Sequence, residues 1–324
     1  MQIGKSPALR REKTASALRV SRSWAEGSGG LTGSPGGGYN ELAKKYRYRE
    51  EIIVQTSMKQ WMRQRKSVRS FDGRALSEED RRSLEQALQA LQNPFQVPVC
   101  FRLLKAGEHG LSSPVIVGAE EYLAAKVKRQ PHFELAYGYS FELACLHALS
   151  LGLGTVMLAA TLNRPAFERA MDLQPGELLP LASPVGYPAQ KRSIRESLMR
   201  KGIKADERKP FEKLFFQGDF AHGLSVQAAG AFAEALELLR WAPSAANGQP
   251  WRAVLSGNEL HFYEAKTMRE NALGDVQKVD LGIALANFDL ARQEDGISGG
   301  FVFEDPGLPA PERTHYIVTF RRQA

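Results

Sequence analysis

One order of secondary-structure patterns occurs twice in this chain of 324 residues, and this repetition constrains its fold more than any other feature. The first set runs from Met58 to Arg192 and the second from Lys209 to Ala324, separated by a charged linker at 193–208. Each set contains a helical pattern, two strand patterns, an apolar helical pattern and a closing strand. Repeats of this length predict two domain-sized copies rather than a solenoid.

The first set predicts a helix that begins after Ser77, where a hydroxyl N-cap precedes acidic residues in the first turn. A second, apolar helix at 139–151 is predicted to end at Gly152, because glycine favours the position after a helix C-terminus. The segment 118–132 is expected to be a short solvated insertion. Strands are predicted at 97–104, 114–117, 155–158 and 181–186.

The second set matches the first in order and spacing. Its helices are predicted at 226–240 and 279–293, and its strands at 252–256, 259–263 and 316–320. We therefore expect an α+β fold of two tandem halves, each with a mainly antiparallel sheet flanked by helices. The apolar helices of both halves are expected to pack against each other at the centre.

The composition is that of a globular protein with a sizeable core, since 43% of the residues are hydrophobic and 24% are charged. No run approaches the roughly 18 apolar residues that a membrane span requires. The two cysteines, Cys100 and Cys145, have no CxxC or metal-ligand spacing. We expect two buried thiols in a reducing compartment, and hence a cytoplasmic protein without a membrane partner.

The net charge of +7 does not indicate a nucleic-acid partner. Residues 1–57 hold ten of the 43 Lys and Arg but five of the 36 Asp and Glu, so the rest is near neutral. Seven glycines between Gly27 and Gly38 favour a disordered basic extension over 1–57. A targeting or interaction tail is the alternative.

Arg65, Ser67 and Arg69 place two guanidinium groups and a hydroxyl at alternate positions. Guanidinium groups bind phosphate oxygens through forked hydrogen bonds, and a hydroxyl can donate between them. This pattern predicts a site for a terminal phosphate. A solvated basic helix end is the alternative interpretation.

A second motif, APSAANGQPW at 242–251, follows the first by about 180 residues. Pro243 fixes the backbone direction, Ser244 offers a donor, and Asn247 with the following glycine permits a tight turn. Such a turn suits the edge and face of a flat ring. An ordinary helix-to-strand connection would have the same composition.

Together these motifs resemble the nitroreductase family of FMN-dependent oxidoreductases, and most closely its internally duplicated members labelled putative TM nitroreductases. The resemblance covers residues 58–324 and rests on four stretches: RxSxRxF at 65–71, GLGT at 152–155, GYPAQKR at 186–192, and APSxxNxQPW at 242–251. Typical members are homodimers that hold FMN in each interface. This chain resembles such a dimer fused into one polypeptide, so a monomer is expected, with further dimerisation left open.

The resemblance implies the cofactor, the reaction and the binding residues. FMN would carry the hydride chemistry, with NAD(P)H as reductant and a nitroaromatic, a quinone or a similar small molecule as acceptor. No catalytic side chain is implied, although Arg69 would tune the flavin. The implied cofactor-binding residues are Arg65, Ser67 and Arg69 toward the phosphate, ribityl chain and N1/O2 side, Lys191 and Arg192 at the phosphate, Gly152, Gly154 and Thr155 beside the ring, and Pro243, Ser244 and Asn247 from the second half.

Departures from the family pattern predict a single complete site. The first half has Gln92-Asn93-Pro94-Phe95 where the second motif should fall, and the second half lacks RxSxRxF and GYP. The mirror site is therefore expected to be degenerate. A related flavin reaction such as reductive dehalogenation, or a non-catalytic flavin-binding protein, remains as an alternative function.

Overall fold

The computed structural model describes residues 57–191, 202, 204 and 206–323. The chain divides into two compact units, Met1–Ile53 and Val54–Ala324, and only the second contains described residues. All of the expected extension over residues 1–57 except Ser57, and most of the predicted linker at 193–208, thus lie outside the described residues. Within the second unit, two sheets of five strands are present.

The first sheet has the strand order β1-β2-β5-β3, with β4 paired to β2 outside this path, and all of its pairs are antiparallel. Helices α3 and α4 precede its strands, and helices α5, α6 and α7 connect β1 to β2, β2 to β3 and β3 to β4. The elements are α3 (Met58–Gln64), α4 (Glu78–Ala90), β1 (Val99–Lys105), α5 (Ala106–His109), β2 (Glu121–Lys128), α6 (Phe133–Ser150), β3 (Gly154–Thr155), α7 (Arg164–Ala170), β4 (Glu177–Leu178) and β5 (Ala182–Gly186).

The second sheet has the order β6-β7-β8-β10-β9, and only the β6–β7 pair is parallel. Helices α9 and α10 accompany it, together with three short 3₁₀ helices. The elements are η2 (Phe211–Lys213), β6 (Phe215–Gln217), η3 (Gly230–Phe232), α9 (Ala233–Arg240), η4 (Ala245–Asn247), β7 (Trp251–Ser256), β8 (Glu259–Ala265), α10 (Val276–Glu294), β9 (Gly299–Val302) and β10 (Thr314–Arg322).

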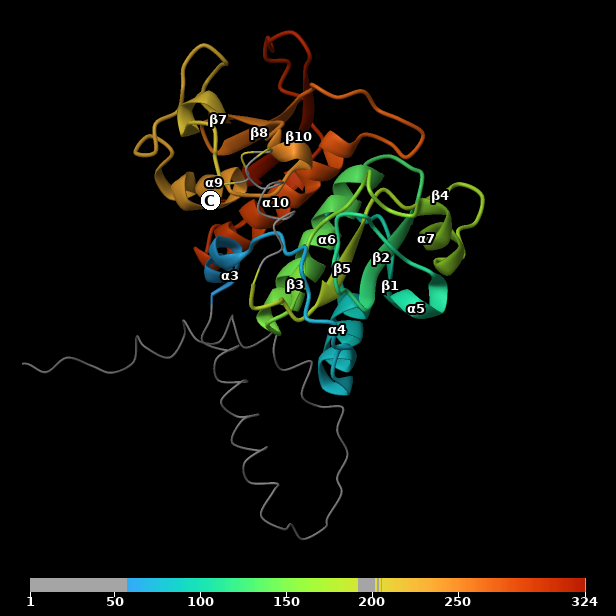
Figure 1. Ribbon diagram of the computed structural model, residues 1–324. Helices are drawn as coiled ribbons and strands as arrows, with labels where there is room; N and C mark the ends of the chain where they lie inside the picture. The colour runs from blue at the N-terminus through green and yellow to red at the C-terminus, as the bar shows by residue number, and fades with distance from the viewer. Residues whose placement is uncertain (1–56, 192–201, 203, 205, 324) are drawn as a thin grey trace, which may run out of the picture. The chain divides into compact units, whose positions relative to one another are not determined.

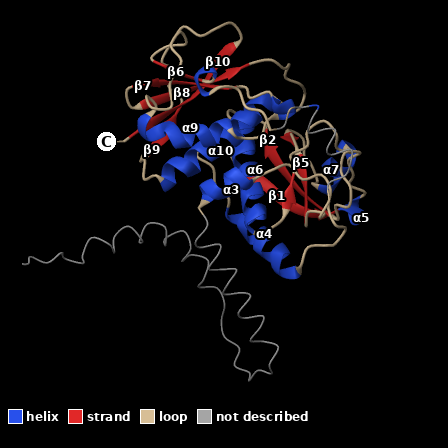
Figure 2. Ribbon diagram, turned by 60° about the vertical axis from the view of Figure 1, so that its left-hand side comes forward, coloured by secondary structure: helices blue, strands red, loops and turns tan. Residues whose placement is uncertain are grey.

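The two halves share one strand order, since β1-β2-β5-β3 corresponds to β7-β8-β10-β9. Figure 1 shows the two sheets in separate parts of the molecule, with α6 and α10 side by side between them. Figure 2 shows the same layering, with helices between the two groups of strands. The predicted α+β fold with central helices is confirmed.

Helices α6 and α10 pack with their backbones in direct contact at two glycines. A Cβ atom on Gly138 would lie 2.0 Å from the carbonyl oxygen of Val279, and one on Gly282 would lie 2.2 Å from that of Leu135. The contacts are reciprocal, because each glycine meets two residues of the other helix. One lies three positions before the other helix's glycine, and the second lies one position after that glycine. This reciprocity gives the helix pair an approximate two-fold axis between Gly138 and Gly282.

The start of α4 follows the prediction, because the Ser77 hydroxyl accepts a hydrogen bond from the Asp80 amide at 3.1 Å. The segment 118–132, expected as a solvated insertion, instead contains β2, and this prediction was wrong. Its acidic start is misleading in the sequence, since Glu121 is 2% exposed and pairs with Arg81 at 2.5 Å. The predicted strand at 114–117 is a turn with a single bridge at Val117.

Cys145 is buried as expected, but Cys100 is exposed. The prediction of two buried thiols was therefore half wrong. Cys100 lies on β1, a strand at the edge of its sheet, where alternate side chains face away from the core. No helix in the part of the chain that the structure describes has the length and apolar character to cross a membrane.

Candidate functional site

The arginine motif forms an extended segment rather than a helix end. Helix α3 ends at Gln64, and the following residues run along β3, where the Val68 amide donates to the Thr155 carbonyl at 2.9 Å. Alternate side chains of an extended segment point to the same side. Val68 is consequently buried, whereas three side chains face a cavity: Arg65, Ser67 and Arg69.

Gly154 allows this segment to lie close to β3. A Cβ atom at this position would lie 2.8 Å from the Cβ of Val68, so any larger residue would displace the arginine segment. Thr155, the next residue, is 6% exposed and lines the cavity itself. Gly152 does not line it, and its φ of +77° after the end of α6 explains the glycine as a helix terminator.

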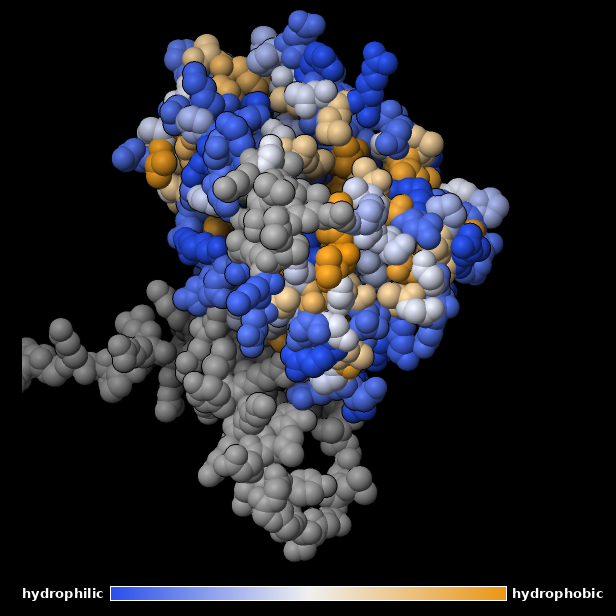
Figure 3. All heavy atoms as spheres, in the orientation of Figure 1, coloured by the Kyte–Doolittle hydropathy of each residue, from blue (hydrophilic) through white to orange (hydrophobic). Residues whose placement is uncertain are grey.

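The cavity lies between the two halves and has a volume of about 500 Å³. This size is within the range of small-molecule and cofactor sites, roughly 300–1,000 Å³. Figure 3 shows hydrophobic surface gathered where the part with β7–β10 meets the part with β2 and β5. Most of the remaining lining is apolar and includes Val115, Val156, Met157, Leu158, Pro180, Leu181, Met268, Leu273, Val276, Val279 and Ile283.

The second motif forms the opposite wall, through Pro243, Ser244 and the two alanines that follow. Ala246, Asn247 and Gln249 all have positive φ angles of 48° to 55°, a conformation that costs non-glycine residues roughly 1–3 kcal/mol each. Hydrogen bonds hold the strained loop, since the Ser244 hydroxyl accepts from the Gln249 amide at 3.0 Å. Strain of this kind is typical of binding sites.

Two further residues expected to contact the cofactor, Asn247 and Lys191, do not line the cavity. Asn247 does not line the cavity, because its side-chain amide donates to the carbonyls of Lys204 and Glu207 at 2.8 and 3.0 Å. It therefore anchors the end of the linker. Lys191 is exposed and is also absent from the lining, and Arg192 lies outside the described residues.

Three buried carboxyl groups at or behind the cavity were not predicted: Asp275 and Asp280, which line it, and Glu142. Asp280 lines it and accepts hydrogen bonds from the Ala245 amide at 3.0 and 3.1 Å. Burial, and next the negative charges of Asp275 and Glu264, raise the pKa of Asp280 well above its usual range, although the Ala245 hydrogen bond opposes the shift. Glu142 lies behind Arg65, and burial raises the pKa of Glu142 to about 7 against the opposing effect of Arg65.

Comparisons with known proteins place the chain in a family. The family model described as "Putative TM nitroreductase" matches residues 57–292. The chain belongs to this family.

Comparison with solved structures gives further matches to this nitroreductase-family chain. A putative nitroreductase from Thermotoga maritima is 20% identical with a TM-score of 0.53, over 82% of this chain and 93% of that one. A nitroreductase family protein from Clostridium difficile 630 is 13% identical with a TM-score of 0.39, over 49% and 96%. A putative nitroreductase in complex with FMN from Desulfovibrio desulfuricans is 21% identical with a TM-score of 0.35, over 44% and 95%. A search of curated proteins found no match.

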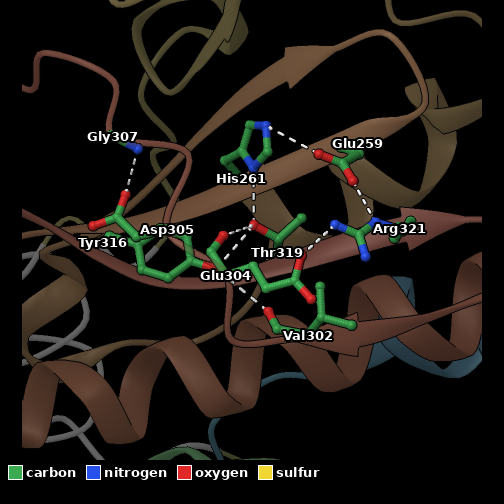
Figure 4. Close-up of polar contacts among 9 residues, drawn as sticks. All are labelled: Glu259, His261, Val302, Glu304, Asp305, Gly307, Tyr316, Thr319 and Arg321. Carbon is green, nitrogen blue, oxygen red and sulfur yellow. Dashed lines mark hydrogen bonds and ion pairs between the residues drawn. The ribbon is translucent and has the colours of Figure 1, made fainter.

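A second polar cluster in this nitroreductase-family chain lies on β8 and β10 (Figure 4). The imidazole Nδ1 of His261 lies 2.8 Å from the hydroxyl of Thr319, and both residues are buried. The Thr319 hydroxyl also donates to the Glu304 carbonyl at 3.2 Å. The Tyr316 hydroxyl lies 2.9 Å from the Thr319 hydroxyl. None of these residues lines the cavity, and their bonds fasten the segment after β9 to the sheet.

Proposed function

We propose that this protein is an FMN-dependent oxidoreductase that takes reducing equivalents from NAD(P)H and passes them to a nitroaromatic, a quinone or a similar electrophile. The observation that supports this most strongly is the composition of a single cavity. Arg65, Ser67 and Arg69 of the first half face the same space as Pro243 and Ser244 of the second. Membership of the nitroreductase family supports the same reaction class.

The residues present suit FMN. Two guanidinium groups on one wall suit the phosphate and the electron-rich N1/O2 edge of the ring, because forked donors match such oxygens. The apolar walls suit the faces of a flat ring system. The Ser244 hydroxyl oxygen accepts a hydrogen bond from the Gln249 backbone amide, so the hydroxyl hydrogen is available to a ligand.

Bound FMN would supply the two-electron chemistry, accepting hydride from NAD(P)H and delivering it to the acceptor. The protein would hold the ring and adjust its electronic state. Arg69 is 8% exposed and lines the cavity, so its charge acts in a medium of low dielectric constant. Placed near N1/O2, it would stabilise the negative charge that reduction adds on that side.

A single chain contributes both walls, so we propose that the two halves are duplicated copies and that a monomer suffices. One FMN per chain is then expected, with no dependence of binding on self-association. Sedimentation of the FMN-loaded protein together with a titration of FMN would measure both quantities. A stoichiometry of one FMN per two chains would exclude this arrangement.

Anaerobic stopped-flow mixing of the FMN-loaded protein with NADH or NADPH tests the proposed reaction. We expect rapid loss of the flavin absorption, followed by its recovery when a quinone or nitroaromatic is added. A non-catalytic flavin carrier would bind FMN without rapid reduction. Absence of FMN binding at micromolar concentration would reject the proposal.

A further inference from the structure

Glu142 is a buried carboxyl group without a hydrogen-bond partner among the described residues. It lies in the middle of α6 and is 0% exposed, and both of its side-chain oxygens lack a hydrogen bond there. Its charged neighbour is Arg65, whose Nε lies 4.0 Å from Glu142 Oε1. Burying a charged carboxylate without hydrogen bonds is costly, so this pair requires an explanation.

The Arg65 side chain lies between the cavity and Glu142. This side chain is 12% exposed and lines the cavity, while Glu142 lies on the protein side of it. An anion in the cavity and an ionised Glu142 would therefore both depend on the same guanidinium. Because the surroundings have a low dielectric constant, the two negative charges would also repel each other.

The two-fold axis between the helices shows that the fold does not need an acid here. Glu142 follows Gly138 by four residues, and the residue four positions after Gly282 is Ala286. Both positions are buried in their helices. At this helix position, an acid is thus present only in the half that carries the arginine motif. This difference links Glu142 to the cavity rather than to helix packing.

We propose that Glu142 competes with the cavity ligand for Arg65, so that binding of a phosphate group in the cavity is coupled to proton uptake by Glu142. The identity of the phosphate compound as FMN rests on the proposed function, whereas the coupling rests on the pair itself. When Glu142 is protonated, the charge of Arg65 is available to the ligand. When Glu142 is ionised, the ligand must compete with it.

The titration range fits this coupling. Burial raises the pKa of Glu142 to about 7, and Arg65 is the charged group that opposes this shift. Cys145, which lies beside Glu142, has a pKa raised to about 12, mainly by burial, and stays neutral. Asp280 also lines the cavity with a raised pKa, so the coupling is measured by the part of the uptake that Glu142→Gln removes. A bound phosphate would raise the pKa of Glu142 further, so protons are taken up between the free and bound values.

Isothermal titration calorimetry of FMN binding in buffers of different ionisation enthalpy measures the proton uptake. About pH 8 is suitable, because a phosphate ester with a second pKa of about 6 is already fully ionised there. The wild type should take up a measurable fraction of a proton per FMN. Riboflavin, which has the same ring but no phosphate, should bind without proton uptake.

Glu142→Gln is the decisive variant, because glutamine mimics the neutral acid. It should abolish the proton uptake by Glu142 and reduce the pH dependence of the FMN Kd, with tighter binding than wild type at high pH. The gain is about tenfold for each unit by which phosphate raises the pKa of Glu142. Arg65→Ala should also abolish the uptake, whereas the exposed acid variant Glu85→Gln should behave as wild type.

A second readout needs no flavin. An infrared pH titration of the protein, taken as wild type minus Glu142→Gln, should show a carboxylic-acid C=O band that disappears near neutral pH. Sulfate, an anion that does not titrate in this range, should move that midpoint to higher pH. No band, or a midpoint unaffected by sulfate, would overturn the coupling even if FMN failed to bind.

The calorimetric outcomes separate this coupling from the proposed function. If wild type binds FMN without proton exchange, the coupling is wrong and the proposed function stands. If Glu142→Gln weakens FMN at every pH, Glu142 only holds Arg65 in place and the coupling is again rejected.

Discussion

The two-fold axis between α6 and α10 relates the cavity to a second position beside the same two helices, called the mirror position below. The cavity is open, whereas the mirror position is filled. Ile283, one residue after Gly282, lines the cavity. Its equivalent, Tyr139, packs against Phe95 with ring centroids 5.9 Å apart. Phe95 also contacts Phe301 at 5.8 Å and Phe303 at 6.1 Å, so aromatic rings fill the mirror position.

Two of the buried acids follow the same division, whereas a third, Asp289, accepts a hydrogen bond from the Tyr139 hydroxyl at the mirror position. Asp280 lies two residues before Gly282 and faces the cavity, whereas the equivalent residue before Gly138 is Ala136. Glu142 has Ala286 as its equivalent. The shared helix frame therefore fixes the positions, and departures from the symmetry fix the chemistry.

Removing both guanidinium groups should have the largest effect on the open side. The double variant Arg65→Ala with Arg69→Ala is expected to weaken FMN binding by roughly 10²–10⁴-fold, because hydrogen bonds to charged groups contribute about 1.5–3 kcal/mol each. Quenching of flavin fluorescence measures the affinity. Arg321→Ala, on the surface of the second sheet, is the control, and an unchanged Kd in the double variant would remove these arginines from the site.

Shortening an aromatic side chain at the mirror position should lower the stability of the fold but create no second FMN site. Phe95→Ala is expected to lower the free energy of unfolding by about 3–4 kcal/mol through the cavity that it leaves. The FMN stoichiometry should stay at one per chain, since the mirror position has no arginine motif. Denaturant titration and FMN titration measure the two effects, and a second bound FMN would contradict the comparison.

Sequence reasoning found the parts of the site that are local. The alternation of Arg65, Ser67 and Arg69 and the turn residues Pro243 and Ser244 are visible in the sequence, and the structure brings them into one cavity. The extended shape of the arginine segment was not predicted, because it depends on the distant partner Thr155. Periodicity located β1, β3, β5, β7, β8 and β10, but it missed the short strands β4, β6 and β9. It also missed β2, where flanking charges concealed a buried strand.

The buried acids could not be assigned from the sequence, for a physical reason. Glu142 stands out only as an acid within an apolar helix, and its partner Arg65 is 77 positions away. Asp280 resembles an ordinary acid near a helix N-terminus until the Ala245 amide is placed against it. Asn247 shows the opposite case. The motif predicted that it contacts the cofactor, but its side-chain amide donates to carbonyls of the linker.

The helix frame itself can be tested through its two glycines. Gly138→Ala and Gly282→Ala should each lower the free energy of unfolding by about 2–3 kcal/mol, because the added methyl group would overlap backbone atoms and force the helices apart. Similar losses are expected, since the contacts are reciprocal. Thermal denaturation measures them, and Gly107→Ala, which meets no atom within 4 Å, is the control.

The smallest expected effect is a pH dependence at Asp280. Because burial raises the pKa of Asp280 in the folded protein, the unfolded chain loses this proton first as pH rises, and folding stability falls above the ordinary carboxyl pKa. Asn keeps an oxygen for the Ala245 amide but carries no charge, so Asp280→Asn should gain stability relative to wild type as pH rises above the ordinary carboxyl range, by at most about 1.4 kcal/mol for each pH unit. Ala136→Ser, at the equivalent position on α6, should show no such trend. Parallel stability curves for wild type and Asp280→Asn would mean that folding does not raise the pKa of Asp280, which would then be ionised in the cavity.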